Sequence, residues 1–250
     1  MNEYLKNLNK IEFVLTNACT GKCKHCSAGD HALCGESIDP EVAASAVRKI
    51  AKEYDIKTVL AFGGEPLLCV DAVREIISAA REMGIPRRQV ITNGYFSNNV
   101  EKIREVADML SECGVNDLLL SVDAFHQETI PLEIVKRFAY EAKSRGVAIS
   151  LQPAWLVSAR DDNPYNRRTG EILASFSDLR IPEREGNVVF PEGNAVKFLA
   201  EYFVGDAPKN PYVEDPRDLR CVSFSANGDV LDGNVYKDDI MNIIADYLPR

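Results

Sequence analysis

The stretch TVLAFGGEP, residues 58–66, shows the unit from which most of the chain is built. Its apolar and β-branched first half favours a buried strand, and its glycines and proline favour a turn directly after that strand. Residues 70–83 then have the apolar spacing of a helix, and Gly84 follows them, as expected just past a helix end. The next apolar run begins near Arg87. A strand, a turn and a helix therefore form one unit of about thirty residues, the usual length of a strand–helix–strand motif.

The same unit recurs further along the chain. Strand-like runs begin near Asp117 and Val147, and helical spacing, followed each time by a glycine, covers residues 100–113 and 132–145. Repeated units of this length predict a parallel sheet with right-handed crossovers. With a first strand in residues 11–16 and a last one in residues 188–190, the chain contains six strand–helix units. We therefore predict an α/β fold, a partial (β/α)6 TIM-like barrel.

The composition changes after Gly205. A proline-rich connector comes first, and Asn227-Gly228-Asp229 between two apolar runs is a strong hairpin signal. Residues 238–247 carry isoleucines spaced for one face of a closing helix. The pattern predicts two parts, a barrel over residues 1–205 and a C-terminal cap over residues 206–250. We expect the cap to cover the open side of the barrel and to form a wall of the substrate pocket.

Charge and composition argue against several classes of protein. The 250 residues carry a formal net charge of −9, which disfavours a general nucleic-acid or membrane surface. No apolar run approaches the roughly 18 residues of a membrane span, and the first residues lack the apolar core of a signal peptide. The odd count of seven cysteines fits poorly with a secreted disulfide framework. We therefore expect a cytoplasmic protein in a reducing interior, with anaerobic conditions a good fit.

Three of the cysteines, Cys19, Cys23 and Cys26, lie close together in a loop-like stretch directly after the first strand. Thiolates at this spacing can ligate one metal centre. Structural zinc sites and ferredoxin-type iron–sulfur cubanes use four ligands, so three cysteines leave one coordination position open, as a site that does chemistry would. Two alternatives remain at this point: a zinc site completed by His25 or His31, and ordinary buried thiols.

Polar residues and glycines follow each of the next strands. In parallel barrels the reacting groups lie at the carboxyl ends of the strands, so these segments would face one mouth together with the cysteine loop. Each segment is common as a turn by itself, but all of them stay in phase with the strands. The segments are Gly63-Gly64-Glu65-Pro66, Thr92-Asn93-Gly94, Ser121-Val122-Asp123 and Gln152-Pro153.

This combination of a Cys-x3-Cys-x2-Cys loop with Gly-Gly-Glu-Pro, Thr-Asn-Gly and Ser-Val-Asp resembles the radical S-adenosylmethionine (SAM) superfamily over roughly residues 10–200. The resemblance implies an iron–sulfur, oxidoreductase-like enzyme in which Cys19, Cys23 and Cys26 hold one [4Fe–4S] cluster, whose fourth iron SAM chelates. The reduced cluster would cleave SAM to methionine and a 5′-deoxyadenosyl radical. That radical would then abstract a hydrogen atom from the substrate.

The resemblance also implies contacts to the cofactor. His25 stands at a position that is usually aromatic in the family and would lie against the adenine. The other implied contacts come from the ends of the strands: Gly63, Gly64 and Glu65 to the methionyl amine, Ser121 and Asp123 with Asn93 to the ribose or the methionyl carboxylate, and Gln152 on the same rim. These assignments agree with chemistry, because an ammonium group attracts carboxylate and carbonyl oxygens, and hydroxyl groups attract short polar side chains.

The C-terminal segment resembles the SPASM/Twitch-type extension of peptide-modifying radical SAM enzymes. Cys221 is the one cysteine that this segment contains, and one thiol cannot hold an auxiliary cluster, so we predict a degenerate extension without a cluster. The resemblance implies a peptide, amino-acid-like or small-molecule substrate and an external electron donor of the flavodoxin or ferredoxin type. Two alternatives stay open: an activase that installs a glycyl radical on a partner protein, and a zinc-stabilised binding protein that is not an enzyme.

A few residues near the mouth are candidates for catalysis or substrate binding. Cys34, in the loop that leaves the cysteines, could return a hydrogen atom to a substrate radical. His126 could bind substrate or move a proton. Arg160 and Arg168, in and beside a polar loop, could clamp a carboxylate or a phosphate. Cys69 stands at a predicted helix start, where the helix dipole could lower the pKa of its thiol.

Overall fold

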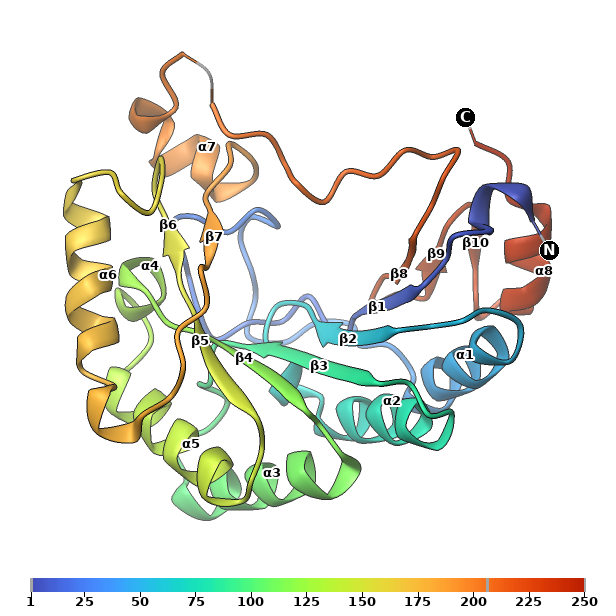
Figure 1. The fold of residues 1–250 in the computed structure, drawn as a ribbon, viewed down its shortest axis with the longest axis horizontal. Helices are drawn as coiled ribbons and strands as arrows, with labels where there is room; N and C mark the ends of the chain where they lie inside the picture. Colours follow the sequence, from blue (N-terminus) through green and yellow to red (C-terminus); the bar gives the residue numbers. More distant parts are fainter. Residues whose placement is uncertain (1, 206, 250) are drawn as a thin grey trace.

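The computed structural model describes residues 2–205 and 207–249. Its main sheet has eight strands in the order β10-β9-β8-β1-β2-β3-β4-β5 and bends into an open arc (Figure 1). Strands β1 to β5 run parallel to one another. They are β1 (Lys10–Val14), β2 (Thr58–Phe62), β3 (Arg87–Thr92), β4 (Asp117–Ser121) and β5 (Ile149–Gln152). The predicted α/β fold with a partial barrel is confirmed.

Four amphipathic helices cover the outer side of the arc (Figure 1). They are α1 (Pro40–Glu53), α2 (Val70–Glu82), α3 (Val100–Cys113) and α5 (Leu132–Ser144). Each buries one apolar stripe, as with Ile76 and Ile77 of α2, because side chains three and four positions apart share a helix face. Helix α3 has the bounds that its periodicity predicts, and Gly114 ends it with a φ of +93°. No helix in the described part of the chain is long and apolar enough to cross a membrane.

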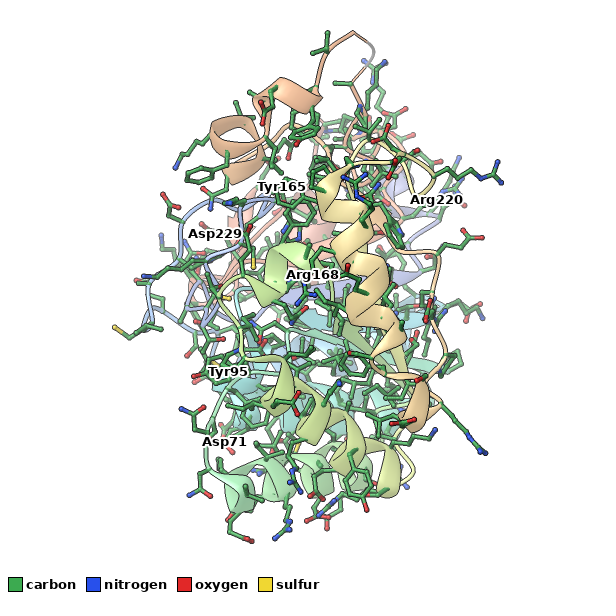
Figure 2. The ribbon with its side chains drawn as sticks, turned by 90° about the vertical axis from the view of Figure 1, so that its left-hand side faces the viewer. Asp71, Tyr95, Tyr165, Arg168, Arg220 and Asp229 are labelled. Carbon is green, nitrogen blue, oxygen red and sulfur yellow. The ribbon has the colours of Figure 1, made fainter. Side chains whose placement is uncertain are left out.

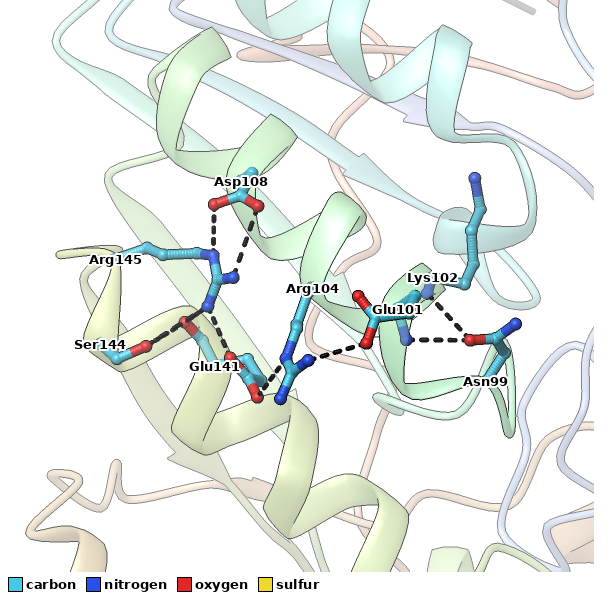
Figure 3. A network of polar contacts seen from close by, with 8 residues as sticks. All are labelled: Asn99, Glu101, Lys102, Arg104, Asp108, Glu141, Ser144 and Arg145. Atoms are coloured by element: carbon cyan, nitrogen blue, oxygen red, sulfur yellow. Dashed lines mark hydrogen bonds and ion pairs between the residues drawn. The ribbon is translucent and has the colours of Figure 1, made fainter.

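A network of ion pairs joins α3 to α5 (Figure 3). Arg145 donates to Glu141 at 2.6 Å and also pairs with Asp108, while Arg104 reaches Glu141 at 3.3 Å. Glu141 is 5% exposed, and a carboxylate so well buried needs cationic partners. Because these partners come from α3 and from the end of α5, the network fixes how the two helices pack. We assign it a structural role.

The end of the fifth unit and the sixth unit depart from the regular pattern. The fifth unit ends with β6 (Ala154–Trp155) and α6 (Pro164–Ala174), and the sixth consists of β7 (Asn187–Val188) and α7 (Asn194–Phe198). The strand predicted at residues 188–190 is β7, which pairs in parallel with β6, the continuation of β5 beyond Pro153. Proline has no N–H to donate, so the ladder is interrupted there and β6 and β7 form a separate small sheet. The remaining short helices are α4 (Ala124–Gln127), η1 (Glu3–Leu5), η2 (Pro66–Leu68), η3 (Ser177–Leu179) and η4 (Ala200–Tyr202).

The predicted C-terminal hairpin and closing helix are both present. They comprise β8 (Cys221–Phe224), β9 (Asp229–Val230), β10 (Gly233–Asn234) and α8 (Ile240–Asp246). Strand β8 lies parallel beside β1, so the hairpin extends the main sheet at its β1 edge. Phe13 of β1 stacks on Phe224 of β8 with ring centroids 4.6 Å apart, and both side chains are fully buried. The C-terminal strands therefore share the core of the barrel. Asp206, where the predicted cap begins, lies outside the described residues.

Candidate functional site

The loop after β1 brings the sulfur atoms of the cysteine motif together. Cys19 and Cys23 are buried, and Cys26 is half-buried. Gly21 lies between the first two: a Cβ atom built there would be 3.7 Å from the Cys19 Sγ and 3.2 Å from the Cys23 Sγ. The Cys26 Sγ lies 3.2 Å from the Nε2 atom of His31. Gly21 therefore leaves space beside the Cys19 and Cys23 thiols, and Cys26 lines the same pocket.

One cavity, of about 130 Å³, joins this loop to the carboxyl ends of β2, β3 and β4. Residues far apart in the sequence meet here because the ends of parallel strands lie along one edge of the sheet. The lining includes His126, a predicted substrate-side residue, and most of the residues that the sequence placed at the cluster or the cofactor: Cys19, Cys23, Cys26, His25, Gly63, Gly64, Asn93 and Ser121. None of the described residues of the C-terminal segment lines this cavity, although the sequence predicted that the segment would form a pocket wall.

The two glycines after β2 lie against the backbone of the cysteine loop. Gly64 donates from its N–H to the Thr16 carbonyl at 2.8 Å. A Cβ atom on Gly63 would be 2.7 Å from that same Thr16 oxygen, and one on Gly64 would be 2.1 Å from the Ala18 oxygen. Both distances are far below any real contact of a Cβ atom with backbone. Gly63 also has a φ of +144°, which favours glycine. The pair therefore lets the end of β2 hold the start of the cysteine loop.

Glu65 points into the protein rather than toward the cavity. Its side chain is fully buried, and its carboxylate accepts hydrogen bonds from the Leu67 N–H at 2.9 Å, the Thr92 hydroxyl at 2.6 Å and the Asn93 N–H at 2.8 Å. These donors come from η2 and from the end of β3. The carboxylate thus ties the ends of β2 and β3 together. From the sequence we expected the Glu65 carboxylate to face the methionyl amine. In the structure its oxygen atoms instead accept hydrogen bonds from protein groups.

We expect Glu65→Gln to lower stability and to flatten its dependence on pH. Burial raises the pKa of Glu65 to about 7, and its three hydrogen bonds hold the pKa back from a larger shift. The native pKa lies above the ordinary value of 4.5, so the stability that this group contributes is fully present below pH 4.5 and is lost as the pH rises through 7. The glutamine side chain would place an amide N–H against a protein donor. We expect this to lower the free energy of unfolding by about 1–3 kcal/mol.

Denaturant unfolding of the metal-free protein at several pH values measures both effects of Glu65→Gln. Glu171→Gln, on the exposed side of α6, is the control and should change neither the midpoint nor its pH dependence. If the variant kept the wild-type slope between pH 4.5 and 7, Glu65 would not be the titrating group.

Asp123 holds His126 at the edge of the cavity. The Asp123 carboxylate is fully buried, accepts from the Phe125 N–H at 2.9 Å to cap α4, and lies 2.8 Å from the His126 Nδ1 atom. Burial would raise the pKa of Asp123, but the charge and hydrogen bonds of His126 outweigh it and lower the pKa to about 2. Burial would lower the pKa of His126, but the charge of Asp123 and its hydrogen bond outweigh burial and raise the pKa of the imidazole. From the sequence we expected Asp123 to contact the ribose or the methionyl carboxylate. In the structure its carboxylate instead holds the His126 ring.

His25 brings an unpartnered nitrogen atom to the site. Its ring lies 4.8 Å from the Phe125 ring and 4.8 Å from the His126 ring, centroid to centroid. Burial lowers the pKa of His25 to about 4, so the imidazole is neutral near pH 7. Its Nδ1 atom is buried and has no hydrogen-bond partner among the described residues. Buried polar atoms normally have partners, so this atom is free for a bound group.

The three thiols suit a metal centre. Burial raises the pKa of Cys19 to about 11 and also raises that of Cys23, so neither thiol ionises by itself near neutral pH. Burial opposes ionisation of Cys26 too, but contacts with His31 and with backbone N–H groups outweigh it and lower the pKa. A bound cation supplies the charge that buried thiolates require. Soft sulfur donors select iron–sulfur clusters or zinc over magnesium and calcium. The donor set therefore fits a thiolate-held cluster.

Several other predicted residues do not line the cavity. Gln152 ends β5 beside Ser121, and Cys34 and Arg160 lie in exposed loops. Arg168 lies on α6, on the side seen in Figure 2, and pairs with Glu171 at 2.7 Å. Cys69 precedes α2 without a side-chain capping bond, and burial raises the pKa of its thiol. The lowered pKa predicted for Cys69 from the helix dipole is therefore wrong.

The structure adds a residue that sequence reasoning did not single out. Asn194, the first residue of α7, donates from its backbone N–H to the Cys26 carbonyl at 2.8 Å. No local pattern marks this asparagine, because the contact joins segments that are far apart in the sequence.

A family model described as the Radical SAM superfamily matches residues 13–148, which is more than half of the chain. The matched residues contain the cysteine loop and the ends of β2, β3 and β4.

The curated relatives include probable GTP 3′,8-cyclases of archaea. The protein of Sulfolobus acidocaldarius is 33% identical over 124 residues, which are 48% of this chain and 36% of that protein. The protein of Saccharolobus islandicus is 26% identical over 219 residues, which are 81% of this chain and 67% of that protein. The chain thus spans about a third and about two thirds of the length of these relatives.

Solved structures with the same fold include Streptococcus suis SuiB bound to S-adenosylmethionine and anSMEcpe with bound AdoMet. SuiB has a TM-score of 0.61 at 12% identity, over 95% of this chain and 65% of that chain. The anSMEcpe structure has a TM-score of 0.61 at 16% identity, over 96% of this chain and 80% of that chain. At these identities the likeness concerns the fold.

Proposed function

The chain belongs to the radical SAM superfamily, enzymes that use a [4Fe–4S] cluster and S-adenosylmethionine, and we propose that Cys19, Cys23 and Cys26 hold that cluster here. The observation that carries the proposal is the shared cavity, which the three thiols line together with the ends of β2, β3 and β4. When bound, the two cofactors supply one-electron cleavage of the SAM sulfonium and hydrogen abstraction from a substrate. Three cysteines leave the fourth coordination position to SAM.

The residues of the chain would bind SAM from several sides. We assign the methionyl group to the backbone of Gly63 and Gly64, whose missing side chains leave room for close approach. Asn93 and Ser121 line the same cavity and offer polar atoms to the ribose or the carboxylate. His25 offers a neutral ring and its unpartnered Nδ1 atom to the adenine. Two buried carboxylates would support this arrangement, because Glu65 holds Asn93 in place and Asp123 holds His126.

His126 is the substrate-side residue that we retain. It lines the cavity, and Asp123 fixes its ring through the Nδ1 atom. A histidine held in this way can donate a hydrogen bond to the substrate or move a proton at its Nε2 atom. Cys34, Arg160 and Arg168 do not line the cavity, so a role for them requires a substrate that reaches beyond its lining.

We propose a small-molecule or peptide substrate, with a low-potential external donor of the flavodoxin or ferredoxin type. The two groups of similar proteins suggest different choices. The curated relatives carry the name of a GTP 3′,8-cyclase, while one solved structure of the same fold is SuiB bound to its precursor peptide SuiA. Incubation with GTP, and separately with peptides, should show which of them accelerates SAM cleavage.

The test of the proposed function is anaerobic. The protein is reconstituted with iron and sulfide, reduced in the presence of SAM, and analysed for bound iron and for 5′-deoxyadenosine. We expect a brown protein that forms 5′-deoxyadenosine together with methionine. A colourless protein that binds zinc in place of iron would overturn the proposal and favour the zinc-stabilised binding protein. A brown protein that cleaves SAM only with a large protein partner would favour the activase.

A further inference from the structure

Asn194 joins α7 to the backbone of the cysteine loop at two points. Its backbone N–H donates to the Cys26 carbonyl at 2.8 Å, and its Nδ2 atom donates to the Cys23 carbonyl at 3.3 Å. The residue is 3% exposed, so these bonds form away from water. Cys23 and Cys26 are two of the three proposed ligands. One asparagine therefore links the carbonyls of both to α7.

The residue before Asn194 shows how closely the two segments approach. Gly193 has a φ of +53°, and a Cβ atom on it would lie 2.3 Å from the Ser27 oxygen and 2.5 Å from the Cys26 oxygen. Only a residue without a side chain fits between α7 and the loop at that distance. At the surface, Lys197 of α7 pairs with Asp30 of the loop at 2.9 Å. The contact is thus a packed interface with a polar edge.

Helix α7 belongs to a small core that is separate from the main one. Ala195 and Leu199 pack with Phe125, Leu156 and Val189, whereas the main core lies between the arc and its outer helices. Figure 1 shows α7 beyond the ends of β6 and β7, away from the helices that cover the sheet. The family match ends at residue 148, so this element lies outside the matched region. A change in α7 can therefore affect the cysteine loop without opening the main core.

We propose that Asn194 is a positioning residue of the metal centre, which sets the spacing of the Cys23 and Cys26 thiols before a cluster binds. The inference rests on the proposed function, because it takes these cysteines as ligands. Within the loop, the Cys23 carbonyl also accepts from the Cys26 N–H and the Cys26 carbonyl from the Gly29 N–H, both at 3.2 Å, so Asn194 adds the bonds that tie these two carbonyls to another element of the fold. Groups that orient metal ligands commonly change metal affinity by about 10–100-fold when they are removed. The Asn194 Oδ1 atom has no partner among the described residues, so the Nδ2 donor carries the effect of the side chain, and a substitution leaves the backbone bond to the Cys26 carbonyl in place.

The experiment compares Asn194→Ala and Asn194→Asp with the wild type and with Lys197→Ala. Aspartate keeps the shape of asparagine and loses the Nδ2 donor, while Lys197→Ala removes the exposed pair on the same helix. We expect both Asn194 variants to lose iron to a chelator at least about 10-fold faster than the wild type. Their reduced clusters should also show a changed electron paramagnetic resonance spectrum and a shifted reduction potential. Lys197→Ala should match the wild type, since exposed ion pairs contribute little.

The outcomes separate this inference from the proposed function. A wild-type protein that holds no cluster overturns both. A wild type that loads iron, with Asn194 variants identical to it in iron retention, spectrum and potential, overturns the role of Asn194 alone. The metal-free variants should melt close to the metal-free wild type, because the main core is untouched. A metal-free Asn194→Ala that is unfolded would mean a general structural role and would also overturn the inference.

Discussion

Cys23→Ala is expected to leave the protein without an intact iron–sulfur cluster and without SAM cleavage. Cys23 is the middle cysteine of the motif, is buried, and lines the cavity beside His25 and His126. Burial raises the pKa of its thiol, so the thiolate form depends on a bound cation. Without it, the site offers two thiols to a cluster that needs three, and no other described cysteine lines the cavity. Iron and sulfide analysis after reconstitution, and mass spectrometry of 5′-deoxyadenosine, measure the loss.

Cys113→Ala is the matched control for Cys23→Ala. Cys113 is also buried with a raised pKa, but it lies in the core at the end of α3. Its removal should reduce stability by a modest amount and leave iron content per folded protein unchanged. Cys34→Ala, in an exposed loop, should likewise keep the cluster. A Cys23→Ala protein with full iron content and normal SAM cleavage would refute the assignment of the ligands.

Gly64→Ala should be nearly as damaging, although it removes no ligand. The new Cβ atom would lie 2.1 Å from the Ala18 oxygen, 2.7 Å from the Ala18 carbonyl carbon and 3.1 Å from the Cys19 Cβ. The two nearest are backbone atoms of Ala18 and the third is the Cβ atom of Cys19, which is fixed to the backbone, so no flexible side chain can move aside. The loop must instead shift away from β2, which would misplace the Cys19 thiol and close part of the cavity. We expect loss of iron binding and of SAM cleavage, measured as for Cys23→Ala.

Gly170→Ala is the control for the added methyl group. Gly170 lies in α6 and a Cβ atom there would meet nothing within 4 Å, so alanine should be neutral or slightly stabilising. Circular dichroism of metal-free Gly64→Ala should still show the helices, because the atoms nearest to the new Cβ atom belong to the cysteine loop and not to the helices that cover the sheet. Normal iron content in Gly64→Ala would mean that the loop does not depend on its contact with β2.

The repeating architecture could be predicted from local patterns in the amino-acid sequence. The spacing of apolar residues and the glycines after each helix predicted strands β2 to β5 and helices α2, α3 and α5, with bounds that differ from the observed ones by few residues. Such patterns are local: a helix or strand buries one face, and the residues on that face recur at a fixed period. The cysteine spacing and the polar residues at the strand ends are local too, which is why most of them could be placed on one mouth in advance.

The direction in which the polar side chains at that mouth point depends on packing between strands. Glu65 and Asp123 follow their strands as predicted, yet both carboxylates face inward. Each is hydrogen-bonded there to backbone N–H groups and to one side chain, Thr92 for Glu65 and His126 for Asp123. A carboxylate at a strand end can face a ligand or a buried set of donors, and the choice depends on neighbouring strands. Spacing within one strand carries no information about those neighbours.

Contacts between distant segments also could not be predicted from the sequence pattern. The hairpin signal at residues 227–229 predicted β8 and β9, but the pairing of β8 with β1 depends on the arc leaving that edge free. Asn194 holds the Cys23 and Cys26 carbonyls from a helix that no motif marks. Hydrogen bonds of this kind form only after the chain has folded back on itself, since they require two backbones to approach within a few ångström. Local periodicity thus fixed the elements of this protein, and packing between distant elements fixed the shape of its site.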